Sequence, residues 1–199
     1  WSWYGDHATT IYGTAMKLSA LGFKVVMAVA GGISGAWAIT KDPLWMMSGA
    51  LAGIIAVAAG LDIYFPAHVI IIATVAGMII KPCADWLEGF GIDDAVGAVT
   101  IHGTIGLFGL LVLGIFGSGY PALAAFAPED AATISFMGQL VGAVVMFLLG
   151  FVPGYIVATV LNAAGMLRVP DAVQIKGLDA VKVPAQAFPE GMTSPESDD

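Results

Sequence analysis

Five long apolar stretches restrict what this sequence can fold into. A helix that crosses a bilayer needs about 20 mostly apolar residues, and the stretches that qualify are Leu18–Ile39, Leu44–Leu61, Ala67–Ile80 running on towards Leu87, Ala95–Gly117 and Ile134–Leu167. Of the 199 residues, 58% are hydrophobic and only 11% are charged, whereas a soluble domain carries roughly 25% charged residues. We therefore predict an all-α, polytopic transmembrane helical bundle of about five spanning helices, with part of a sixth in Trp1–Thr10.

The basic residues outside the apolar stretches predict an orientation in the membrane. If the helices thread back and forth, one side of the bilayer receives Lys41, Lys81, Arg168, Lys176 and Lys182. Because loops rich in lysine and arginine face the cytoplasm, we expect a bundle (residues 1–167) followed by a cytoplasmic C-terminal tail (residues 168–199). Lys17 and Lys24 are exceptions near the start of the first helix, where a long side chain can extend outwards to the membrane surface.

The composition argues against several classes of function. The seven lysine and arginine residues form no basic stripe of the kind that binds nucleic acid. Cys83, the single cysteine, can form no disulfide within the chain and matches no metal or redox motif. The sequence shows no nucleophile–base pair, no pair of catalytic carboxylates and no metal-ligand cluster. We therefore expect a protein that is not an enzyme and that needs no metal and no cofactor.

Glycines recur at helical spacing on the predicted helices. The sets are Gly31 with Gly35, Gly49 with Gly53, and Gly103 with Gly106 and Gly109. Lipid gives helices little hydrophobic reason to associate, so small residues that let two backbones approach closely supply the packing. These glycines predict a tight bundle, and Gly103 places one such contact beside His102.

His102 lies early in the fourth predicted helix, in an otherwise apolar and glycine-rich stretch. Ionisable groups inside membrane helices are costly and usually face a cavity or a partner. Two interpretations are open: a neutral imidazole that hydrogen-bonds a carbonyl of a neighbouring helix, or an imidazole that lines a narrow polar path with one nitrogen donating and the other accepting. Just before this helix, Asp93 and Asp94 can cap its free amides and suit the positive end of its dipole.

The stretch from Gly91 to Gly109, GIDDAVGAVTIHGTIGLFG, resembles the start of the tenth helix of the Amt/Mep/Rh ammonium-channel family. Further matches follow in the family's order. Trp1–Gly5 resembles the middle of its sixth helix, Ser48–Gly60 its eighth helix, and Pro66 falls at the turn before its ninth. Gln139 fits its eleventh helix, and Leu167–Phe188 resembles its cytoplasmic tail. The resemblance implies that the chain corresponds to the C-terminal half of an eleven-helix protein and starts within the sixth helix.

The resemblance implies two inverted five-helix repeats and a final oblique helix, assembled as a homotrimer with one pore per subunit. Ammonium is expected to lose its proton near the outer mouth, after which ammonia and the proton cross an apolar pore lined by two histidines, one from each repeat. His102 matches the second of these, and the missing first repeat, with the other histidine, is expected upstream or on a separate chain. Aligning WSWYGDHATT on the sixth helix places Thr10 where a recognition-site serine is expected, and Asp6 where a gating phenylalanine is expected.

Two functions are consistent with these residues. The first is part of an ammonium or ammonia channel or transporter in the inner membrane of the cell, to which this chain contributes one pore histidine. The alternative is a non-conducting structural or regulatory subunit of a larger membrane complex. His102 favours the first, whereas Asp6, the missing repeat and Phe108 in place of a tryptophan favour the second. In the family the tail can bind PII-type signalling proteins, and its altered ending here, PAQAF, counts against that partner.

Overall fold

The computed structural model describes residues 10–11, 17–92, 94, 96–120 and 132–176, and every regular element in these ranges is a helix. In chain order the elements are α1 (Leu18–Thr40), α2 (Pro43–Ala58), α3 (Pro66–Glu88), the π-helix η1 (Ala98–Ile105), α4 (Gly106–Phe116), α5 (Phe136–Ala163) and α6 (Asp171–Lys176). The all-helical fold class is confirmed. The chain divides into two compact units, residues 1–146 and 147–199, and the functional division predicted after residue 167 stays a prediction.

Four helical spans of the described residues are long and apolar enough to cross a membrane, and they match four of the five predicted stretches: Leu18–Thr40, Pro66–Glu88, Ala98–Phe116 and Phe136–Ala163. The remaining stretch forms α2, which is shorter than predicted, with 16 residues. At 1.5 Å per residue it is about 24 Å long, less than the ~30 Å of the hydrocarbon core. Its start is fixed by Asp42, whose Oδ1 accepts a hydrogen bond of 2.8 Å from the Leu44 amide.

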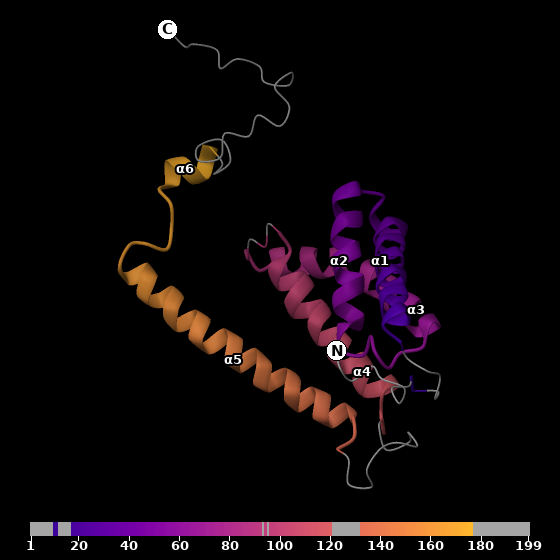
Figure 1. The fold of residues 1–199 in the computed structure, drawn as a ribbon. Helices are drawn as coiled ribbons and strands as arrows, with labels where there is room; N and C mark the ends of the chain where they lie inside the picture. The colour runs from indigo at the N-terminus through magenta and orange to yellow at the C-terminus, as the bar shows by residue number, and fades with distance from the viewer. Residues whose placement is uncertain (1–9, 12–16, 93, 95, 121–131, 177–199) are drawn as a thin grey trace. The chain divides into compact units, whose positions relative to one another are not determined.

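The helix α1 packs against both α2 and α3, and Figure 1 shows α1 and α2 running side by side. Glycines let the backbones approach, as predicted. A Cβ atom built on Gly31 would lie 2.8 Å from the Ile70 carbonyl oxygen of α3, and one on Gly49 would lie 2.5 Å from the Gly32 carbonyl oxygen of α1. Real Cβ atoms do not come so close, so any larger residue at these two positions would separate the helices.

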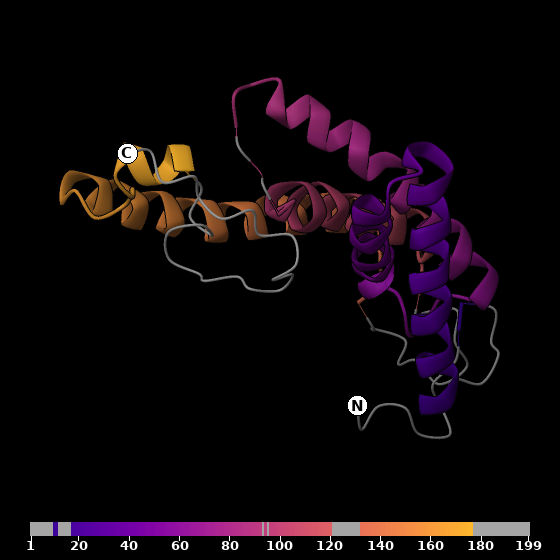
Figure 2. The same ribbon diagram turned by 90° about the horizontal axis from the view of Figure 1, so that it is seen from above.

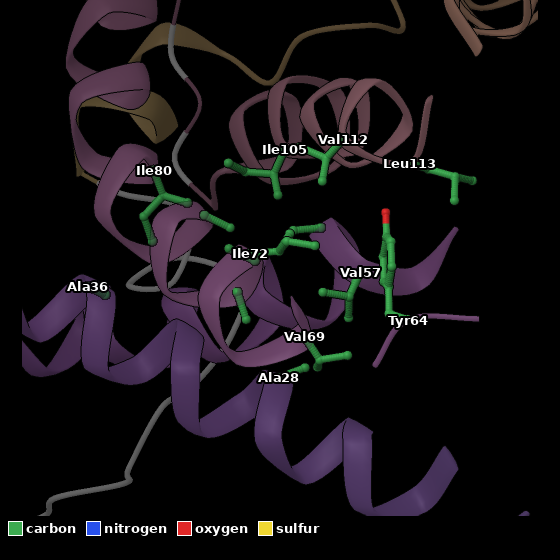
Figure 3. Close-up of a cluster of buried hydrophobic side chains, with 14 of the residues drawn as sticks. Ala28, Ala36, Val57, Tyr64, Val69, Ile72, Ile80, Ile105, Val112 and Leu113 are labelled. Carbon is green, nitrogen blue, oxygen red and sulfur yellow. The ribbon is translucent and has the colours of Figure 1, made fainter. Parts of the chain in front are cut away.

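The buried core lies between these three helices and the η1–α4 segment (Figure 3). Small and branched side chains fill most of it, among them Ala28, Val57, Val69, Ile72 and Ile105. Tyr64, in the turn between α2 and α3, is fully buried, and Figure 3 shows its hydroxyl oxygen pointing towards the side of the cluster where Val112 and Leu113 lie. That hydroxyl has no hydrogen-bond partner among the described residues. Burial raises the pKa of Tyr64 above its ordinary value.

The helix α5 has 28 residues and contains Pro153 in its interior; it is the long orange helix of Figure 2. At 1.5 Å per residue it is about 42 Å long, which exceeds the hydrocarbon thickness of a bilayer. Its second part carries a ladder of stacked rings in which the centroids of Phe147 and Phe151 are 5.3 Å apart, and those of Phe151 and Tyr155 are 5.7 Å apart.

Candidate functional site

His102 lies on the exposed side of η1. Thr100, Ile101 and Ile105 of the same helix are buried, whereas Val99 and His102 are exposed. One side of the helix is therefore fixed in the core while the other presents the imidazole outwards. No hydrogen bond to another described residue holds the ring, so the interpretation of an imidazole bonded to a neighbouring carbonyl finds no support within the described part of the chain.

The segment that carries His102 is a π-helix, which the sequence did not predict. In a π-helix each amide bonds a carbonyl five residues earlier, and such turns occur frequently at functional sites. The wider turn changes which side chains share a face, so a register calculated for an α-helix does not hold through Ala98–Ile105. Gly103 follows His102 on the exposed side, and a Cβ atom built there would have only the Val99 methyl group within 4 Å, at 3.8 Å. Within the described residues, Gly103 therefore makes no close contact with a second helix.

Asp94 caps the start of η1 with both oxygens of its carboxylate. Its Oδ1 accepts a hydrogen bond of 3.0 Å from the Val99 amide, and its Oδ2 accepts one of 2.9 Å from the Thr100 amide. Partial burial acts to raise the pKa of Asp94, but the hydrogen bonds from these amides outweigh it and hold that pKa below its ordinary value. The ionised carboxylate thus satisfies two amides that a helix start otherwise leaves free. These amides belong to residues that lie three and two positions before His102 in the chain.

Gly97 turns the chain between Asp94 and η1. Its φ of 70° lies in the left-handed region, which a residue with a Cβ atom adopts only at an energetic cost. The Gly97 amide donates a 2.8 Å hydrogen bond to the Asp94 carbonyl, and the Gly97 carbonyl accepts one of 2.7 Å from the Ile101 amide. The geometry of the histidine-bearing helix therefore depends on a carboxylate and a glycine that precede it.

Thr10 lies at the other end of the bundle. It is buried, and the amide of its neighbour Ile11 donates a 2.8 Å hydrogen bond to the Ile63 carbonyl in the turn between α2 and α3. The helix α3, with 23 residues, runs from this turn to the Asp94 end over about 34 Å. The structure thus places Thr10 near one end of α3 and Asp94 near the other. Asp6 falls outside the described residues.

Lys24 is also found at the Thr10 end, and its environment differs from the prediction. The side chain is 1% exposed, and its ammonium group donates hydrogen bonds to the carbonyls of Tyr64 at 2.8 Å and Asp62 at 3.1 Å. The prediction that it extends outwards to the membrane surface was wrong, because these carbonyls meet it inside the bundle. A single charge within an apolar stretch was the available signal, since charged residues in membrane helices commonly pair with backbone carbonyls.

A cavity of about 380 Å³ lies between the first half of α2 and the segment that leads into η1. Apolar side chains such as Trp45 and Leu51 line most of it, and Glu88 and Asp94 supply carboxylates. His102 is not among its lining residues, so the cavity and the histidine are separate features of the unit. Among the described residues, no group of three or more histidine, cysteine, aspartate or glutamate side chains could hold a metal ion.

Several apolar spans around a glycine-packed core define an integral membrane protein of the helical-bundle class. A sequence model of the Ammonium Transporter Family matches residues 5–188. The ammonium transporter Amt2 of Methanocaldococcus jannaschii is 33% identical over 194 residues, covering 94% of this chain and 44% of the relative. Amt2 of Archaeoglobus fulgidus is 32% identical over 200 residues, covering 94% of this chain and 43% of the relative. Amt1 of M. jannaschii is 31% identical over 192 residues, covering 94% of this chain and 47% of the relative.

The chain belongs to the ammonium transporter family, as its resemblance predicted. It spans less than half the length of the three relatives, whose names describe transporters and not enzymes. The family match includes every residue singled out from the sequence as a site candidate: Asp6, Thr10, Asp94, His102 and Gly103.

Proposed function

We propose that this chain is part of a transporter or channel for ammonium or ammonia, and that His102 lines its conducting path. Family membership supports the transport activity. The single observation that supports the role of His102 is its position on the exposed side of a π-helix whose other side is fixed in the core. An ionisable ring held in this way can meet a solute or a second part of the transporter.

The proposal rests on the cost of moving charge through an apolar medium. A charged group at the centre of a bilayer costs at least ~2.5 kcal/mol, and considerably more by some estimates, whereas neutral ammonia needs only intermittent hydrogen bonds. A neutral imidazole offers one donor and one acceptor nitrogen. In our proposal, ammonium dissociates into ammonia and a proton near the Thr10 end and both then cross, and the His102 ring hydrogen-bonds the neutral ammonia as it passes.

The remaining parts of the pore belong to the same proposal. The half of the family fold that this chain does not span contributes a second histidine and covers the exposed side of η1. The complete subunits assemble as homotrimers in the lipid bilayer, with the tail at the cytoplasmic side. Asp94 acts indirectly, because it holds the first turn of the helix that carries His102.

Methylammonium uptake by membranes that carry the complete assembly tests the proposal. We expect His102→Ala to change the uptake rate about tenfold, the effect of one lost hydrogen bond of about 1.4 kcal/mol to the passing molecule. Val99→Ala is the matched control, because Val99 is exposed on the same helix and has no polar side-chain atom; it should leave uptake unchanged. Equal uptake by the His102→Ala variant and the wild type would contradict the role of His102.

A non-conducting subunit is the second candidate, and Asp6 is the observation that favours it. A carboxylate where the resemblance places an aromatic gate would add a charge at the pore mouth. If membranes with and without the chain take up methylammonium equally, this second candidate is favoured and the transport proposal fails.

A further inference from the structure

The turn between α2 and α3 presents three consecutive carbonyls that all bind hydrogen-bond donors from other parts of the chain. The carbonyls of Asp62 and Tyr64 accept from the Lys24 ammonium group, at 3.1 Å and 2.8 Å. The Ile63 carbonyl between them accepts from the Ile11 amide at 2.8 Å. The first and third carbonyls thus bind Lys24 of α1, and the middle carbonyl binds the Ile11 amide. A single turn therefore joins α1 to the Thr10–Ile11 segment.

The chemistry of this turn matches a primary ammonium group. An ammonium group has three donors and no acceptor, and the two carbonyl oxygens that face it are acceptors only. Among the described residues, Lys24 forms no hydrogen bond with the Asp62 carboxylate. The Oδ1 of that carboxylate accepts a 3.0 Å hydrogen bond from the Ile63 amide of its own turn.

The turn is ordered by its own hydrogen bonds as well. The Gly60 carbonyl accepts from the amides of Ile63 at 3.0 Å and Tyr64 at 2.8 Å. Tyr64, the last of the three residues that present these carbonyls, is fully buried. Its ring leaves no space for a side chain at Gly60, where an added Cβ atom would lie 2.7 Å from two ring carbons. The hydrogen bonds of the turn and the packing of the Tyr64 ring therefore hold the carbonyl oxygens in position independently of Lys24.

We propose that the carbonyls of Asp62 and Tyr64 form a binding site for a primary ammonium group, that Lys24 fills this site from within the chain, and that the filled site holds the Thr10–Ile11 segment in place. The site is separate from the proposed transport path through His102, and its test requires no uptake. Without the Lys24 ammonium group, two carbonyls inside an apolar bundle lose their donors, and the turn that holds Ile11 loosens.

The test uses Lys24→Ala in the complete protein, with hydrogen exchange at the Ile11 amide as the readout. Alanine removes the Cγ, Cδ, Cε and Nζ atoms, and n-propylammonium supplies three carbons and one ammonium group in their place. We expect the variant to lose about tenfold in protection at Ile11, the loss that corresponds to about 1.4 kcal/mol, and n-propylammonium to restore it with saturation. Tetramethylammonium, a cation without N–H donors, should not restore it. Lys17→Ala, which removes an exposed lysine next to α1, should not change the protection.

Two outcomes overturn the inference: unchanged protection at Ile11 in Lys24→Ala, or equal restoration by tetramethylammonium. If the alanine variant does not fold, acetylation of the lysine side chains in the wild-type protein tests the inference instead. The inference predicts that Lys24 stays unmodified under conditions that acetylate Lys17 and Lys41, which are exposed. Acetylation of Lys24 at the rate of Lys17 would also overturn it. If the wild type does not take up methylammonium, in contrast, the proposed transport function fails and the inference about the Lys24 site is unaffected.

Discussion

The two ends of α3 are organised by single charged side chains of opposite sign. At one end the Lys24 ammonium group donates to two backbone carbonyls, and at the other the Asp94 carboxylate accepts from two backbone amides. Asp94 binds groups five and six residues away in sequence, whereas Lys24 binds groups 38 and 40 residues away. Lys24 is fully buried and Asp94 only partly. The first therefore stabilises the tertiary structure, and the second stabilises the start of one helix.

Lys24→Met should have the largest effect on stability. Methionine fills a similar volume but leaves the carbonyls of Asp62 and Tyr64 without a donor, and each unsatisfied buried group costs about 1–3 kcal/mol. We expect the free energy of unfolding to fall by about 2–6 kcal/mol in total, measured by denaturant unfolding in detergent micelles. Lys17→Met should be neutral. If Lys24→Met lowers the free energy of unfolding less than Asp94→Ala does, Lys24 does not stabilise the tertiary structure more strongly than Asp94 stabilises its helix.

Asp94→Ala should have a smaller effect, because it removes a helix cap and leaves the tertiary contacts in place. Loss of such a cap costs about 1 kcal/mol. Asp94→Asn keeps an oxygen that can accept from one amide, so it should fall between the alanine variant and the wild type in the same unfolding experiment. If asparagine destabilises as much as alanine, the negative charge is the stabilising factor, and not the hydrogen bond to the amide.

The contribution of Asp94 should depend on pH in a defined direction. The folded-state pKa of Asp94 lies below its ordinary value, so the unfolded chain binds the proton more tightly. The stabilisation is therefore complete above the unfolded pKa of about 3.9 and is lost as the pH falls through the lower, folded pKa. The difference in unfolding free energy between wild type and Asp94→Ala should shrink over this window. A difference that grows towards low pH would contradict the assignment.

Combining the variants gives the smallest expected effect. The two groups lie near opposite ends of a helix about 34 Å long and share no partner, so their effects should add within about 0.5 kcal/mol. The double variant Lys24→Met/Asp94→Ala tests this in a double-mutant cycle. A coupling energy above 1 kcal/mol would show that the two ends are linked through the bundle.

This comparison also shows what could be predicted from the sequence. Spans such as α1 and α3 follow from length and apolarity, the role of Asp94 follows from its place before a helix, and the contacts of Gly31 and Gly49 follow from helical spacing. All of these depend on neighbours in sequence or on a regular period. The carbonyls that bind Lys24 come from a turn almost 40 residues later in the chain, and no local pattern indicates them.

The π-helix illustrates a second limit. Apolar periodicity assumes a regular α-helix, and η1 departs from it over the eight residues that include His102. The sequence shows an ionisable group within an apolar span, but the side of the helix on which it lies depends on the wider turn. The predicted contact at Gly103 depended on the same α-helical register, and the described residues show no close neighbour there.

The most direct test of a conducting path at His102 uses a thiol in place of the imidazole. In a Cys83→Ser background, which removes the single cysteine of this chain, His102→Cys places one thiol on the proposed path, and Ile71→Cys places one on the exposed side of α3. Silver ions are small, monovalent and bind thiolates. We predict that silver blocks methylammonium uptake by the His102→Cys assembly and leaves uptake by the Ile71→Cys assembly unchanged. Equal sensitivity of the two variants, or silver-resistant uptake with His102→Cys, would contradict the account.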